Sequence, residues 1–134
     1  MTNILQQFDT VAFSEEGAWL YLCAPGTDEK VYTDKEKKKP LRIKLKGPDS
    51  DPWVSFQKKV LRRDKKAAQN VDDEFEDSKL LAKMTITWEN LPSEAGECTY
   101  ENALKLYINY KDIRRQVLHF VVNQENFTQR LPTD

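Results

Sequence analysis

The clearest pattern in the chain is the helical spacing of apolar residues in its C-terminal half, over residues 80–127. Each group of apolar residues predicts a helix with one buried face. Because helices of about 10–15 residues are marginal alone, we expect these faces to pack together and form the core. The three groups are Leu81, Met84 and Trp88; Ala103, Leu104, Tyr107 and Ile108; and Ile113, Val117, Phe120 and Val121.

Polar residues predict where these helices begin. Asn70 can cap a helix that runs to about Thr87, with the acidic residues at 72–77 near the positive end of its dipole. Thr99 is the expected N-cap of a helix over residues 100–109, and Asp112 that of a helix from residue 113 to about 123. Phe127 is then placed to fold back on the last helix.

The first half of the chain predicts strands. The apolar run at 18–23 ends in an Ala-Pro-Gly turn, and a second strand-like run at 30–33 would complete a hairpin. Leu41, Ile43 and Leu45 alternate with basic residues, as expected of a strand with one buried and one basic face. Residues 1–17 are polar with scattered apolar positions, which predicts a loosely docked arm or a short edge strand.

A basic helix is expected after the turn at 47–50. Asp51 precedes a proline that suits the first helical position, so it predicts an N-cap. Trp53, Phe56, Val60 and Ala67 fall on the inner face, and lysines and arginines cover the rest. Together the elements predict one α+β domain over residues 1–134: a flexible arm at 1–17, a small N-terminal antiparallel sheet at 18–46, and about four helices at 51–127.

The charge is unevenly distributed along a chain of net charge -1. Residues 35–66 contain 13 Lys and Arg and four acids, whereas the remaining residues contain eight bases and 18 acids. Opposite charges on one small protein favour association with further copies or with a charged partner, and salt would weaken that association. Such runs are also commonly just solvated faces, and this alternative stays open.

The sequence offers little catalytic chemistry. His119 is the single histidine, and no serine or cysteine nucleophile is identifiable beside it, which favours a structural or surface role over that of a general base. Cys23 and Cys98 have no zinc-site spacing and are expected to be reduced thiols. The acidic run at 72–77 matches no calcium loop, and four glycines form no phosphate-binding motif. We therefore expect no enzymatic activity, no cofactor and no bound metal, and the sequence shows neither a signal peptide nor a membrane-spanning run.

Motifs beyond residue 40 resemble the tail assembly chaperones of long-tailed bacteriophages. They comprise a strand at 41–45 with the Gly-Pro-Asp-Ser turn at 47–50, the stretch LLAKMTITWENL at 80–91, Thr-Tyr-Glu-Asn-Ala at 99–103 with Leu106 and Tyr107, Ile-Arg-Arg-Gln-Val at 113–117, and Asn126 with Phe127.

This resemblance implies a non-enzymatic protein of the host cytoplasm that binds the tape-measure protein and helps to recruit tail-tube subunits. The chain length resembles the short form of a pair that is related by translational frameshifting. Contact between a basic patch and an acidic surface of the next copy would give a homo-oligomer. The alternative is a small nucleic-acid-binding protein that uses the basic strand and helix of residues 35–66. The candidate protein-interaction residues are Lys58, Lys59, Arg62, Arg63, Asp72, Asp73, Glu74 and Phe127.

Overall fold

A computed structural model of the chain describes residues 4–63 and 73–127. Its sheet has three antiparallel strands in the order β1-β2-β3, formed by Ala18–Tyr21, Arg42–Leu45 and Thr85–Glu89. The α-helices are α1 (Thr10–Glu16), α2 (Asp51–Arg63), α3 (Asp73–Met84), α4 (Tyr100–Asn109) and α5 (Lys111–Val121). Short 3-10 helices lie at Ile4–Phe8 (η1), Ser93–Ala95 (η2) and Gln124–Phe127 (η3). The predicted α+β class is confirmed.

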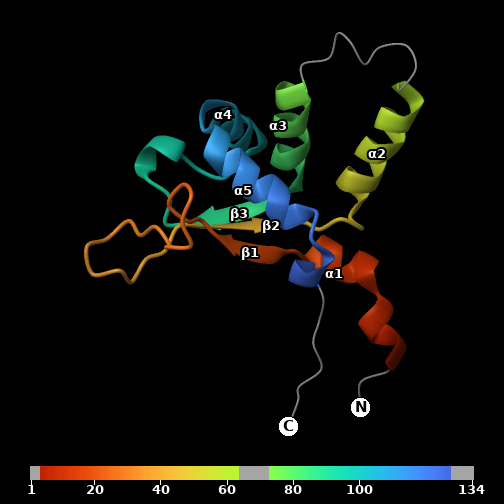
Figure 1. The fold of residues 1–134 in the computed structure, drawn as a ribbon, viewed down its shortest axis with the longest axis horizontal. Coiled ribbons are helices and arrows are strands. Elements are labelled where there is room, and N and C mark those ends of the chain that lie inside the picture. The colour runs from red at the N-terminus through yellow and green to blue at the C-terminus, as the bar shows by residue number, and fades with distance from the viewer. Residues whose placement is uncertain (1–3, 64–72, 128–134) are drawn as a thin grey trace.

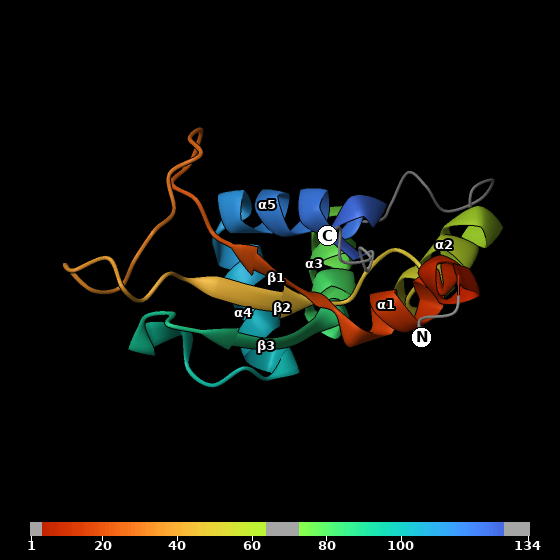
Figure 2. The same cartoon turned by 90° about the horizontal axis from the view of Figure 1, so that it is seen from below.

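Three helices cover one face of the sheet. Figure 1 shows α3, α4 and α5 above the strands, and Figure 2 shows the strands in front of these helices when the molecule is seen from below. The strand alternation places Ile43 and Leu45 on the covered face, where both are fully buried. Helical partners in this core include Leu81, Tyr107 and Val117, all likewise fully buried. The apolar spacing in the sequence therefore identified most of the core.

The third strand replaces the end of a predicted helix. The helix expected to reach about Thr87 ends at Met84, and Thr85–Glu89 pairs with β2, placing Trp88 opposite Ile43. Thr85, Ile86 and Thr87 are β-branched, which favours extended backbone over helix. The Thr85 hydroxyl donates to the Leu81 carbonyl oxygen at 2.8 Å and satisfies one of the last acceptors of α3.

Two predictions for the N-terminal half were correct only in part. The first residues form η1 and α1 rather than an edge strand, and the Asp9 side chain caps α1 by accepting from the Ala12 N–H at 3.1 Å. The hairpin expected between residues 18–23 and 30–33 forms only near its turn, where Cys23 and Lys30 make an antiparallel bridge, the Val31 N–H donates to the Leu22 carbonyl oxygen at 3.0 Å and the Ala24 N–H donates to the Glu29 carbonyl oxygen at 2.9 Å. Strand β1 itself pairs with β2.

The predicted helix starts were correct to within a few residues. Thr99 caps α4 as expected, accepting from the Asn102 N–H at 3.1 Å. Asp112 is not a cap, because α5 begins at Lys111 and Asp112 lies in its first turn, where it accepts from the Gln116 amide. Asp51, expected as the cap of α2, is its first residue. The cap predicted at Asn70 and the inner-face position Ala67 lie outside the described residues.

Candidate protein-interaction site

Among the residues that the structure describes, the predicted interaction residues lie on α2 and α3, with Phe127 as the exception. Lys58 is exposed on α2. Figure 1 shows the C-terminal end of α2 and the N-terminal end of α3 at the same end of this pair, away from the sheet. Asp72 lies outside the described residues, and only the backbone is described for Lys59, Arg62, Arg63, Asp73 and Glu74.

The described part of the basic segment of residues 35–66 extends along the molecule from the loop to α2. Figures 1 and 2 place the loop at 24–40 at one end of the molecule and α2 at the other, with β2 between them. Two of the three cations at residues 42–46 are paired: Arg42 contacts Glu89 at 2.7 Å, and Lys46 contacts Glu15 at 3.1 Å. The cations at positions 42 and 46 are therefore partly neutralised within the chain itself.

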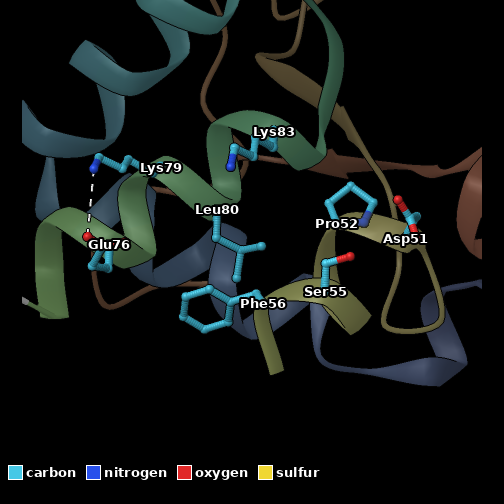
Figure 3. Close-up of a pocket in the computed structure, with 8 residues that line it drawn as sticks. All are labelled: Asp51, Pro52, Ser55, Phe56, Glu76, Lys79, Leu80 and Lys83. Atoms are coloured by element: carbon cyan, nitrogen blue, oxygen red, sulfur yellow. Dashed lines mark ion pairs between the residues drawn. The ribbon is translucent and has the colours of Figure 1, made fainter. Parts of the chain in front are cut away.

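A cleft of about 460 Å³ separates α2 from α3. In the close-up of Figure 3, Phe56 from α2 and Leu80 from α3 point toward one another. Leu80 is only 4% exposed and belongs to the core, so this contact joins α2 to the body of the protein. The lining residues are Asp51, Pro52, Ser55, Phe56, Glu76, Lys79, Leu80 and Lys83.

The rim of the cleft carries both signs of charge. On α3, the Lys79 ammonium lies 3.7 Å from a Glu76 carboxylate oxygen and 4.5 Å from the centre of the Phe75 ring. Lys83 is exposed one turn further along and makes no ion pair within the residues that the structure describes. The cleft therefore combines an apolar contact at its base with charged side chains that a polar partner could reach.

Helix α2 is held at its base by α1, a connection that the sequence did not suggest. The Glu15 carboxylate accepts from the Asp51 N–H at 2.7 Å, so an acid from α1 sits at the positive end of α2. The buried Ser14 hydroxyl accepts from the Asp49 N–H at 3.0 Å, and the Ser14 carbonyl oxygen accepts from the Gly47 N–H at 2.9 Å. Glu15 is an ordinary surface acid by sequence pattern, and nothing in its neighbours signals this role.

These contacts lower the pKa of Glu15. The largest cause is the hydrogen bond from the Asp51 backbone N–H, followed by the ion pair with Lys46, and both favour the charged carboxylate. Because the Glu15 side chain is 36% exposed, water screens part of this stabilisation. The N-terminal end of α2 is thus held by the charge of Glu15 as well as by packing.

The inner face of α2 follows the predicted pattern as far as the side chains are described. Trp53 and Phe56 are partly buried against the core, and their ring centres lie 6.5 Å apart. Helix α2 packs mainly against α3. The side chain of Val60 is outside what the structure describes. Helix α2 is therefore attached to the rest of the protein through a small apolar contact made by Trp53 and Phe56.

Phe127 occupies a different place from the other predicted interaction residues. Its side chain is 3% exposed, and its ring packs edge-on against Phe120 with the centres 5.4 Å apart. The fold-back on the last helix is therefore confirmed. The buried ring offers almost no surface to a partner. It packs instead against the turn at Gly47.

Other candidate chemistry is sparse in the described part of the chain. Residues 4–63 and 73–127 contain no group of three or more His, Cys, Asp or Glu side chains placed to hold a metal ion. Both thiols are free, and His119 is exposed on α5. Over the same residues, no helix has both the length and the apolar character needed to cross a membrane.

Comparison with known proteins leaves the family open. No protein-family model, curated protein or solved structure matches this chain.

Proposed function

We propose that this chain is a non-enzymatic tail assembly chaperone of a long-tailed phage, and that it binds a helical segment of the tape-measure protein in the cleft between α2 and α3. The observation that carries the proposal is the cleft itself. Its apolar base and charged rim suit a helix that has one apolar stripe and polar flanks. The resemblance described above supplies the identity of the client.

The mechanism uses shape and charge without bond chemistry. An apolar stripe of the client covers the Phe56 and Leu80 contact, while Lys83 pairs with acids beside the stripe. Rim contacts of this kind are individually weak, so many copies along one client are needed to keep a long helix in solution. Recruitment of tail-tube subunits, homo-oligomerisation and action in the host cytoplasm belong to the same proposal.

The proposal predicts that a long, helix-rich reading frame, which encodes the tape-measure protein, lies beside the gene of this chain. The experiment is co-expression of the chain with the product of that reading frame, followed by co-purification. The variant Ser55→Trp fills the cleft from the exposed side of α2, and Lys83→Glu reverses a rim charge. Ser55→Trp should weaken binding about ten-fold or more because it blocks the cleft, whereas Lys83→Glu should weaken it by about two- to five-fold because a rim contact is individually weak. Lys111→Glu changes an exposed lysine on α5 that does not line the cleft, and it serves as the matched control. Wild-type binding by both cleft variants would contradict the proposal.

Nucleic-acid binding remains the second candidate, and the described strand β2 gives it limited support. The Arg42 guanidinium lies 4.1 Å from the centre of the Trp19 ring and is bound to Glu89, so its charge is already partly neutralised. Retention of duplex DNA at moderate salt separates the candidates. Binding of DNA that Lys58→Glu weakens, without binding of the tape-measure product, would favour this alternative.

A further inference from the structure

The N-terminal arm, η1 with the start of α1, presents apolar side chains to solvent. Phe8 is 73% exposed and Val11 is 59% exposed, and Leu5, three residues before Phe8, is 72% exposed. Leu5 and Phe8 lie three residues apart on one side of η1, and Val11 follows at the start of α1. Grouped apolar side chains of this exposure mark a surface that another molecule covers.

A matching apolar groove lies elsewhere on the molecule. It has a volume of about 400 Å³ and runs between η2, the end of α4 and the two roots of the loop at 24–40. Leu22 and Leu41 come from the loop roots, Leu91 from the segment before η2, and Ile113 from α5. Ala95 and Lys105 lie along its edge, so the groove has an apolar floor and a partly polar rim.

The arm and the groove lie at opposite ends of the molecule. In Figures 1 and 2, η1 and α1 are at the end near α2, whereas η2 and the loop at 24–40 are at the other end. The arm therefore does not reach the groove of its own chain. A second copy is the occupant that satisfies both surfaces at once.

Charge also favours contact between copies. Residues 1–17 contain three acids and no base, whereas the loop at 24–40, whose roots line the groove, contains five lysines and four acids, with four of the lysines at residues 35–39. An acidic arm entering the groove would pass this lysine cluster. The attraction orients the approach, and burial of the apolar side chains supplies most of the affinity.

We propose that the arm of one copy docks in the groove of the next, joining copies head to tail. Such a heterologous contact repeats until the array closes as a ring or continues as an open spiral. Each copy would bring its α2–α3 cleft into the array. The argument for self-association depends only on the arm and the groove. The idea that the array presents many α2–α3 clefts to one long client rests on the proposed function.

Sedimentation velocity over a concentration series tests the contact. The wild-type chain should form species larger than a monomer as its concentration rises. Phe8→Ser removes the arm's aromatic side chain, and Ala95→Trp fills the groove, so each should weaken self-association about ten-fold or more. Val122→Ser changes a residue that is 47% exposed and belongs to neither surface, so it should assemble as the wild type does.

Mixing the two variants gives the sharper result. Phe8→Ser keeps an intact groove and Ala95→Trp keeps an intact arm, so the mixture should form a dimer with one copy of each and nothing larger. A wild-type monomer at every concentration, or a mixture that stays monomeric although both variants are folded by circular dichroism, would overturn the proposal. A monomeric chain that still binds the tape-measure product would refute self-association alone. An assembling chain that fails to bind this product would refute the proposed function alone.

Discussion

Replacing Gly47 by alanine should destabilise the protein by crowding the joint between β2 and α2. A Cβ at this position would lie 2.6 Å from Phe127 Cγ, 2.8 Å from Phe127 Cδ1 and 2.8 Å from the Ser14 hydroxyl oxygen. Carbon atoms in contact prefer about 3.5–4.0 Å, so the ring would have to retreat by about 1 Å. Because Phe127 is buried and also packs on Phe120, that retreat disturbs a second contact.

The cost has an upper limit that the structure supplies. If the crowding became too large, η3 would leave its place, and the protein would lose the burial of one phenylalanine side chain, about 1.5–3 kcal/mol. Overpacking of a well-packed site commonly costs about 1–3 kcal/mol. We therefore expect Gly47→Ala to lower the free energy of unfolding by about 1–3 kcal/mol, measured by urea titration with tryptophan fluorescence.

A double-mutant cycle identifies the cause. Phe127→Ala removes Cγ and Cδ1, the two atoms of Phe127 that lie beside Gly47, so Gly47→Ala should cost clearly less in that background than in the wild type. Gly26→Ala is the contrasting control, because no atom lies within 4 Å of its Cβ position and its cost comes from a backbone φ of 74°. That cost should be the same with phenylalanine or alanine at position 127. A neutral Gly47→Ala, or an equal cost in both backgrounds, would refute the crowding argument.

Three further substitutions test the joints of the fold by the same titration. Tyr107→Phe removes a buried hydroxyl that lies 2.6 Å from the Thr85 hydroxyl oxygen, and it should cost about 1 kcal/mol, whereas Tyr110→Phe at an exposed position should cost less than about 0.5 kcal/mol. Thr99→Ala removes the cap of α4 and should cost about 1 kcal/mol, most of which Thr99→Ser should restore. Glu15→Gln should cost about 0.5–1 kcal/mol at neutral pH, since the pKa of Glu15 is lowered in the folded protein and its charged form is the stabilising one. This contribution is present above the ordinary pKa of 4.5 and is lost as the pH falls through the lowered value, so the difference between wild type and Glu15→Gln should shrink in acid. A difference that grows in acid would show that the sign is wrong.

Sequence reasoning succeeded where local signals act alone. Thr99 precedes a run with clear helical spacing, and its hydroxyl meets the N–H three residues later in the chain. Ile43 and Leu45 alternate with charged residues, and the pleat of a strand buries them without help from distant residues. In both cases the pattern and the tertiary environment favour the same structure.

It failed where two signals competed. Met84 and Trp88 continue a helical spacing, whereas Thr85, Ile86 and Thr87 favour a strand. Pairing with β2 decided between them, and a spacing pattern does not report the availability of that partner. The partner of β1 was missed for the same reason, since the adjacent segment at 30–33 suggested a local hairpin.

The candidate site was foreseen only in part. The basic run on α2 and the acidic run in the first turns of α3 indicated an interaction region, and the fold brings the two helices together. The cleft depends on how Phe56 meets Leu80 and on how Glu15 holds the first turn of α2. These contacts join residues more than 20 positions apart, and no local pattern encodes them.

The unequal anchoring of α2 and α3 leads to a last prediction. Helix α3 contributes Leu80, Leu81 and Met84 to the core at 4% exposure or less, whereas the apolar residues that α2 packs against the core, Trp53 and Phe56, are only partly buried. Local opening should therefore need less free energy in α2 than in α3. Amide hydrogen exchange measured by NMR should show lower protection for residues 54–58 than for residues 79–84. Equal protection would mean that α2 is as firmly bound as the core. Lower protection that rises on addition of the tape-measure product would mean that the client stabilises α2 against the body of the protein, as expected for a ligand bound between the two helices.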